Sequence, residues 1–293
     1  MRQATASKLL LLLLAPGCAR PAPAPAPAPD PTNAAAPQPA PPRAPDPAVV
    51  EVEAEDAGAT DAAVEIRPLA REAVDGPHEE LALEAGRPVF YALAKEASVE
   101  PRLIGHLHGV CGAPSYACGK WIGAGSAAGI MVCPTGNARC GDPSLGPPSW
   151  EAPSWGELVG IMDKDLEAAV AKVAKKKPLS REGAILTGYS RGAYAAPSIA
   201  RAHPKRWRHL VLIEANAPLT PAGLRAAGVR SVALIAGEHG TEIRGMKKTE
   251  AALEAESFPA KLFVMRKTGH PYSADMEDVM SAALTFVLTH DTD

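Results

Sequence analysis

AILTGYSRG, from Ala184 to Gly192, joins a short apolar run to a serine that has a glycine two residues away on each side. The apolar run predicts a buried strand, and the residues after Gly192 predict a helix. A serine between strand and helix must sit on a sharp, strained turn, where the flanking positions come too close to neighbouring backbone for a side chain. The pattern predicts that the Ser190 hydroxyl projects from the edge of a sheet as a nucleophile.

The rest of the globular part alternates short apolar runs with amphipathic stretches. This alternation predicts an α/β fold with a mostly parallel central sheet flanked by helices. We expect one helix over 155–177 and a last helix over 274–289 capped by Ser273, and we expect an early hairpin over 80–92. The predicted strands are 103–107, 129–133, 184–187, 210–214, 232–236 and 262–266.

The turn, the order of elements and a late histidine together resemble the α/β-hydrolase family, in its lidless esterase branch, over about 200 residues. That family has its nucleophile, acid and histidine in this chain order, with the histidine between the final strand and the final helix. Lys267-Thr268-Gly269-His270 occupies that place. The resemblance therefore implies Ser190 as nucleophile and His270 as its general base.

The resemblance also implies an oxyanion hole. His108-Gly109-Val110 is similar to the family's H-G segment, so the backbone N–H groups of Val110 and Arg191 are the expected donors. His106 and His108 share one side of a strand, which could indicate a metal site, but the sequence offers no further ligands beside them. His209 and His239 are expected at the surface or in loops.

The third member of the triad is where the sequence departs from the family. Gly240 occupies the usual position of the acid. Glu242, Glu238 and Glu214 are the nearby alternatives, and Glu242 is preferred because its longer side chain can compensate for a displaced backbone. An acid is needed there because it orients the imidazole and stabilises its cation.

The N-terminal part predicts export. Arg2 and Lys8 precede a short apolar run that ends in Ala15-Pro16-Gly17-Cys18, which resembles the lipobox of bacterial lipoproteins. The predicted organisation is a signal peptide (1–17), a Pro/Ala-rich tether (18–48) beginning at lipid-modified Cys18, an undetermined lead-in (49–79) and a hydrolase domain (80–293). An ordinary secretory signal is the alternative. Ala19 after the cysteine favours the outer membrane in such lipoproteins.

The remaining cysteines form an even set within thirty residues, which predicts disulfides in an oxidising compartment. Short, equal gaps favour pairing Cys111 with Cys118 and Cys133 with Cys140. Zinc is the alternative, although the C-x6-C spacing is not typical of it.

The net charge is −3 and the sequence has no long basic run, so we expect no binding of nucleic acid. We expect no cofactor, a small-molecule or polymer-borne ester as substrate, and membrane contact through the lipid only. A peptidase of the same fold and a non-catalytic binding lipoprotein remain alternatives, the latter because of Gly240. Aromatic residues of the loops before residue 156 are candidates for substrate stacking: Tyr116, Trp121, Trp150 and Trp155.

Overall fold

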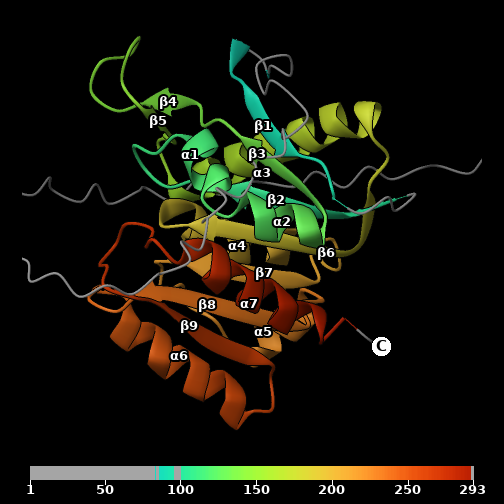
Figure 1. Ribbon diagram of the computed structural model, residues 1–293, viewed down its shortest axis with the longest axis vertical. Coiled ribbons are helices and arrows are strands. Elements are labelled where there is room, and N and C mark those ends of the chain that lie inside the picture. Colours follow the sequence, from blue (N-terminus) through green and yellow to red (C-terminus); the bar gives the residue numbers. More distant parts are fainter. Residues whose placement is uncertain (1–82, 84–85, 96–99, 292–293) are drawn as a thin grey trace, which may run out of the picture. The chain divides into compact units, whose positions relative to one another are not determined.

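The computed structural model describes residues 83, 86–95 and 100–291. The predicted signal, tether and lead-in, and most of the first arm of the predicted hairpin, lie outside these residues. The elements are shown in Figure 1. The strands are β1 (Val89–Ala92), β2 (Arg102–Leu107), β3 (Ile130–Pro134), β4 (Ala138–Arg139), β5 (Pro148–Ser149), β6 (Ser180–Tyr189), β7 (His209–Ile213), β8 (Ser231–Gly237) and β9 (Ala260–Met265). The helices are α1 (Pro114–Gly119), α2 (Ile122–Ala128), α3 (Trp155–Lys176), α4 (Arg191–Ala202), α5 (Pro221–Ala226), α6 (Ile243–Ala255) and α7 (Met276–Leu288).

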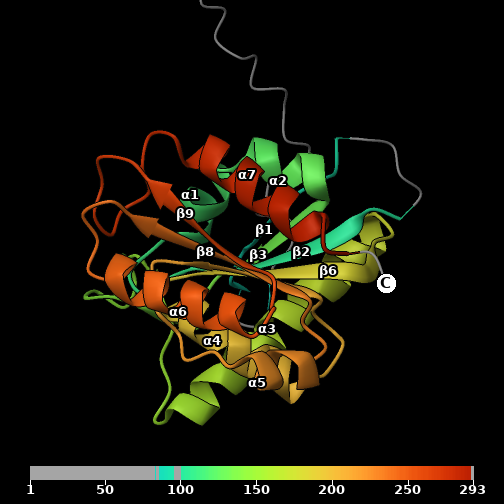
Figure 2. The ribbon, with the colours of Figure 1, turned by 90° about the horizontal axis from the view of Figure 1, so that it is seen from below.

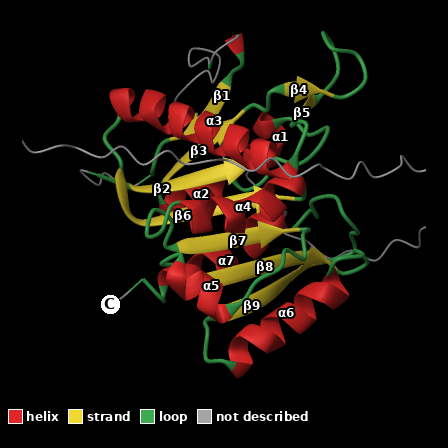
Figure 3. Cartoon of the chain, turned by 180° about the vertical axis from the view of Figure 1, so that it is seen from behind, coloured by secondary structure: helices red, strands yellow, loops and turns green. Residues whose placement is uncertain are grey.

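The predicted α/β sheet is confirmed. Within the described residues the main sheet has seven strands in the order β1-β3-β2-β6-β7-β8-β9, and all neighbours are parallel except β1 and β3. Figure 3 shows β2, β7 and β8 as arrows pointing the same way. Each of the six predicted strands is present. The apolar runs of the inner strands are buried on both faces, as a parallel sheet requires, whereas the edge strand β9 leaves Val264 exposed. The carboxyl ends of these strands therefore meet at one edge.

Helices cover both faces of the sheet, as Figure 2 shows from below. Side chains from α3, α4, α5 and α6 pack into one apolar cluster. Those of α1, α2 and α7 pack into the other. Burying apolar surface on both sides is the main favourable term in the stability of such a three-layer fold.

The long helix α3 follows its sequence pattern closely. Its N-cap, Ser154, accepts a hydrogen bond from Glu157 N at 3.3 Å, and its last turn carries lysines that suit the helix dipole. The predicted apolar face is buried, at Leu158, Met162, Leu166, Val170 and Val173.

One sequence expectation about local structure is wrong. α7 begins at Met276, after the N-cap Asp275, and the Ser273 hydroxyl donates to the Asp275 side chain instead of capping the helix. The strand 89–92 pairs antiparallel with β3 and completes the main sheet. Most of the first arm of the expected hairpin lies outside the described residues, so the hairpin stays a prediction; at its turn, Leu83 N donates to Arg87 O at 2.6 Å.

The four cysteines form two disulfides, as predicted, but the preferred pairing is wrong. Cys111 is bonded to Cys140, and Cys118 to Cys133. Short helix α1 carries Cys118 back onto β3, where Cys133 lies, with the two Cα atoms 6.8 Å apart. The loop around β4 and β5 brings Cys140 to within 5.4 Å of Cys111, measured between Cα atoms. Tertiary placement, not sequence gap, decides which thiols meet.

Among the described residues, no helix has the length and apolar character needed to cross a membrane.

Candidate active site

The predicted turn at Ser190 is present between β6 and α4. Ser190 has φ 52° and ψ −117°, a conformation that non-glycine residues rarely adopt. A Cβ on Gly188 would lie 2.5 Å from Gly192 O, and one on Gly192 would lie 2.1 Å from Leu107 O. Both glycines are therefore required for the backbone to turn this sharply against β2.

The segment predicted to supply an oxyanion donor lies against this turn. A Cβ on Gly109 would lie 3.1 Å from Ser190 Cβ and 2.8 Å from the Tyr189 ring. Val110, the next residue, therefore follows directly beside the nucleophile, and its side chain is 39% exposed. Arg191 opens α4 immediately after Ser190. The two expected donor residues thus flank Ser190 on separate segments.

His270 lies in the loop between β9 and α7, as predicted. Its backbone oxygen accepts a hydrogen bond from the Tyr189 hydroxyl at 2.7 Å, and its ring centroid lies 5.2 Å from that of Tyr189. The histidine loop is thereby tied to the residue that precedes the nucleophile. The imidazole is half exposed, so a substrate can reach it.

A second set of contacts fixes the histidine loop to the end of β8. His239 N donates to Thr268 O at 2.9 Å, and Lys267 N donates to the Glu238 carboxylate at 2.9 Å. A Cβ on Gly237 would lie only 1.9 Å from Gly269 O. Glycine at 237 is therefore needed for the two loops to approach each other.

The carboxylate beside His270 belongs to Glu214, the residue directly after β7. Its Oε2 lies 3.3 Å from His270 Nδ1, without the alignment of a hydrogen bond, and its other oxygen accepts from Gly237 N. Glu214 is 1% exposed. Burial raises the pKa of this carboxyl above its ordinary value, and the Gly237 N–H and His270 oppose the shift.

The preference for Glu242 as the acid is wrong on geometry. Glu242 directly precedes α6, and its carboxylate accepts hydrogen bonds from Asn216 N at 2.9 Å and from the Tyr194 hydroxyl at 3.1 Å. The first contact ties Glu242 to the loop that carries Glu214, and the second ties it to α4. Glu238 binds Lys267 N, as described above, so of the three acids considered only Glu214 contacts the imidazole.

Gly240 accounts for the change of position. A Cβ at residue 240 would lie 3.1 Å from Glu214 Oε2 and 3.4 Å from its Oε1. A side chain at 240 would thus point into the space that the Glu214 carboxylate fills. The chain places an acid in the same volume from the end of β7 instead of from the loop after β8.

His106 and His108 are buried and do not form a metal site. His108 Nε2 accepts from Gly136 N at 2.9 Å, so its proton is on Nδ1, which donates to Gly109 O at 2.7 Å. Burial lowers the pKa of His108 to about 4 and that of His106 to about 3. Within the described residues no group of three metal-ligating side chains is found.

The expectations for the other two loop histidines had different outcomes. His239 is exposed in a loop, as predicted. His209 is fully buried at the start of β7, where Nδ1 lies 2.8 Å from the Ser231 hydroxyl and Nε2 lies 3.1 Å from Asp291. The prediction for His209 is therefore wrong, because the strand begins one residue earlier than its apolar run.

Two of the four aromatic candidates for substrate stacking are unavailable. Trp121 and Trp150 have no exposed surface, whereas Tyr116 is 53% and Trp155 47% exposed. Tyr116 is linked to the site by a row of rings, with centroids 6.0 Å apart from Tyr116 to Tyr272 and 4.6 Å from Tyr272 to Tyr189. Tyr116 is thus the exposed aromatic residue connected to the histidine side of the site.

Comparison of the sequence with family models and with curated proteins gave no match. Solved structures do match. Esterase PE8 aligns with a TM-score of 0.53 and 18% identity, over 69% of this chain and 99% of that one. The S-formylglutathione hydrolase of Agrobacterium tumefaciens aligns with a TM-score of 0.51 and 15% identity, over 70% and 90%. A Staphylococcus aureus serine hydrolase, FphF, aligns with 0.51 and 12%, over 71% and 93%.

The chain has the α/β-hydrolase fold. The connection from β7 to β8 contains only the short helix α5, so no cap domain is inserted there. The site at the carboxyl ends of the strands is consequently open to solvent.

Proposed function

We propose that the chain is a serine hydrolase that cleaves carboxylic esters through an acyl-enzyme at Ser190. The observation that carries the proposal is the contact of the buried Glu214 carboxylate with His270 Nδ1. The loop that carries His270 is hydrogen-bonded to Tyr189, which directly precedes Ser190 at the strained turn. An imidazole held at Nδ1 by a carboxylate uses Nε2 as general base.

The chemistry follows from these roles. His270 removes the Ser190 proton as the hydroxyl oxygen attacks the ester carbonyl, and the negative charge that develops on the carbonyl oxygen is stabilised by the N–H groups of Val110 and Arg191. The imidazolium returns its proton to the leaving alcohol. Water, activated by the same base, then releases the acid. Glu214 orients the ring and stabilises its cation throughout.

The open site supports a small or polymer-borne ester as substrate. No cap is inserted between β7 and β8, and Tyr116 offers an exposed ring on the histidine side. The structural neighbours include proteins named as an esterase and as an S-formylglutathione hydrolase. A non-catalytic binding role has less support, since the Glu214 carboxylate occupies the space whose emptiness at Gly240 suggested a broken triad. A peptidase of the same fold would use the same three residues and is the second candidate.

Labelling with a fluorophosphonate tests the enzyme proposal. One structural neighbour is named as a fluorophosphonate-binding serine hydrolase, which makes this reagent a natural choice. We expect the wild-type protein to be labelled and to hydrolyse a short-chain aryl ester, and we expect Ser190→Ala to lose both while keeping its circular dichroism spectrum. A folded wild-type protein that neither binds the reagent nor hydrolyses any ester would contradict the proposal.

We also propose that the enzyme is exported and held at the outer membrane by a lipid on Cys18. The charged start, the short apolar run and the lipobox-like Ala15–Cys18 support this location. The two disulfides are typical of a protein that folds in an oxidising compartment. The tether after Cys18 would let the hydrolase domain work at a distance from the membrane.

A further inference from the structure

The loop that carries Val110 is held by one neighbouring segment, Gly136–Trp150, which we call the 136–150 segment. β2 ends at Leu107, so the loop that follows has left the main sheet. Gly136 N donates to His108 Nε2 at 2.9 Å, and Trp150 Nε1 donates to His108 O at 3.0 Å. The disulfide from Cys111 to Cys140 adds a covalent link one residue beyond Val110. The backbone is thus fixed to the 136–150 segment both before Val110, at His108, and after it, at Cys111.

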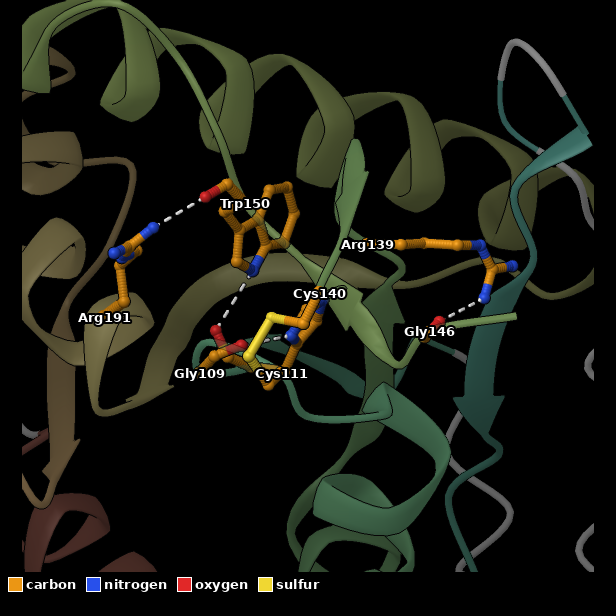
Figure 4. The surroundings of a disulfide bond; sticks show 8 residues. Gly109, Cys111, Arg139, Cys140, Gly146, Trp150 and Arg191 are labelled. Atoms are coloured by element: carbon orange, nitrogen blue, oxygen red, sulfur yellow. Dashed lines mark hydrogen bonds between the residues drawn. A yellow bond between two sulfur atoms is a disulfide. The ribbon is translucent and has the colours of Figure 1, made fainter. Parts of the chain in front are cut away.

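The same segment also contacts the other expected oxyanion donor. The Arg191 guanidinium donates from Nη1 to Trp150 O at 2.7 Å. Figure 4 shows Trp150 between Arg191 and the Cys111–Cys140 disulfide, with its indole nitrogen pointing to the loop near Gly109. Trp150 therefore bridges the two segments on which the donors lie.

The 136–150 segment is held by a buried ring and by its own hydrogen bonds. The Trp150 ring is fully buried and stacks on His108, with centroids 4.9 Å apart and the planes 28° from parallel. Within the segment, Cys140 N donates to Pro147 O at 2.9 Å and Arg139 donates to Gly146 O at 2.8 Å. Its turn is stabilised by the Asp142 carboxylate, which accepts from Ser144 N at 2.7 Å.

We propose that the 136–150 segment positions the oxyanion hole, with Cys111, Cys140 and Trp150 as positioning residues. This inference rests on the proposed function. Oxyanion donors stabilise a transition state only when they are preorganised, and a misplacement of about 1 Å can cost as much as a hundredfold in rate. Cys111 itself has φ 53°, in the left-handed region, so the backbone beside Val110 is held in a conformation that a loosened loop would leave.

The second disulfide is a matched control. Cys118 and Cys133 are 5% and 0% exposed and join α1 to β3 in the core. Cys111 is exposed and Cys140 half-buried, in the loops beside Ser190. Removing either bond should lower the melting temperature, because each constrains the unfolded chain. Only loss of the bond at Cys111 should change the chemical step.

The experiment compares Cys111→Ser/Cys140→Ser with Cys118→Ser/Cys133→Ser, well below both melting temperatures. For the first variant we expect kcat on a short-chain ester to fall about ten- to a hundredfold with KM nearly unchanged, since the donors act on the transition state. The rate of fluorophosphonate labelling should fall in parallel, because the phosphoryl oxygen occupies the same hole. The control variant should keep the wild-type kcat.

Trp150→Phe provides a second test that does not depend on the cysteines. Phenylalanine keeps a ring to stack on His108 but lacks the Nε1–H that binds His108 O. We expect a smaller fall in kcat, again without a matching rise in KM. Mild treatment of the wild-type protein with dithiothreitol should reproduce the cysteine result: two electrons and two protons convert the disulfide to two thiols as the reagent forms its cyclic disulfide. Reoxidation should restore kcat.

The outcomes separate this inference from the proposed function. A wild-type protein that is active, together with a Cys111→Ser/Cys140→Ser variant of unchanged kcat, would overturn the positioning role alone. Equal loss of kcat in both disulfide variants would also overturn it, since a general effect on folding would then explain the loss. A wild-type protein without labelling or activity would overturn the proposed function and this inference with it.

Discussion

At the scale of single residues, Glu214 is a buried acid next to an exposed histidine. It is almost fully buried, and its carboxylate faces an imidazole that is half exposed. A buried carboxylate is costly unless it is paired and hydrogen-bonded. Here the Gly237 N–H and His270 supply the compensation, while burial still raises the pKa of the carboxyl above 4.5.

Glu214→Gln separates the catalytic role from the burial cost. Glutamine can still accept from Gly237 N, so the loop should keep its position. Loss of the carboxylate should lower kcat by about two to four orders of magnitude, because orientation of His270 is lost while the oxyanion donors remain. Glu242→Gln, whose side chain contacts Asn216 and Tyr194 instead, should cost far less.

The same variant has a predicted pH dependence of stability. The pKa of Glu214 is raised in the folded protein, so ionisation of this carboxyl lowers the free energy of unfolding. The loss is complete above the folded-state pKa, and it is absent below about pH 4, where the carboxyl is protonated in both the folded and the unfolded state. Glu214→Gln should therefore gain stability relative to wild type as the pH rises from about 4 to about 8. Thermal unfolding across that range measures it, and a difference in melting temperature that does not vary with pH would contradict the assigned direction.

At the scale of elements, the site consists of strand ends and the loops after them. Ser190 follows β6, Glu214 follows β7, and His270 follows β9. Parallel neighbours bring these ends to one edge, so local sequence around Ser190 and His270 was enough to predict where both residues lie. The acid could not be predicted in the same way. Glu214 and Glu242 both lie near that edge, and the choice depends on the left-handed turn at Glu214 and the Gly237 N–H that faces it.

The position of the acid, after β7 instead of after β8, can be tested by restoring activity with a second substitution. Glu214→Ala should remove most activity. Adding Gly240→Asp to that variant should restore kcat at least about tenfold, because a Cβ at 240 lies beside the vacated space and loss of the acid costs two orders or more. The φ angle of Gly240 is outside the left-handed region, so its backbone suits an aspartate, although a Cβ there would lie 3.1 Å from Gly237 O and that backbone must shift slightly.

Gly240→Asn on the Glu214→Ala background is the control for this rescue. It fills the same volume without a charge and should restore nothing. A folded Glu214→Ala/Gly240→Asp protein that is no more active than Glu214→Ala would show that the two positions do not serve the same histidine.

At the scale of the whole molecule, the described part of the chain has the mostly parallel sheet that the sequence predicted. Which cysteines are bonded, and which strand lies beside β1, could not be predicted from the sequence. Equal gaps suggested the wrong partners for Cys111 and Cys133, because the path of α1 and of the loop around β4 and β5 is not encoded in cysteine spacing. For the same reason the pairing of β1 with β3, which completes the sheet, was not predicted.

The lipid anchor is a prediction about the whole molecule. Cys18→Ser should move the protein from the membrane fraction to the soluble fraction after expression in a bacterium that processes lipoproteins. Ester hydrolysis in each fraction gives the distribution, and the hydrolase domain should keep its specific activity because the substitution lies far in sequence from Ser190. An unchanged distribution would show that Cys18 does not carry the anchor.

The short distance between residue 240 and the Glu214 carboxylate also limits how many acids this space can hold. A Gly240→Asp chain that keeps Glu214 would crowd two carboxyl groups beside one histidine, and like charges that close favour one group that keeps its proton. Glycine at 240 therefore leaves Glu214 as the single acid in that space. The single variant Gly240→Asp, assayed across pH, should show its activity shifted toward higher pH relative to wild type, and an unchanged profile would contradict this crowding.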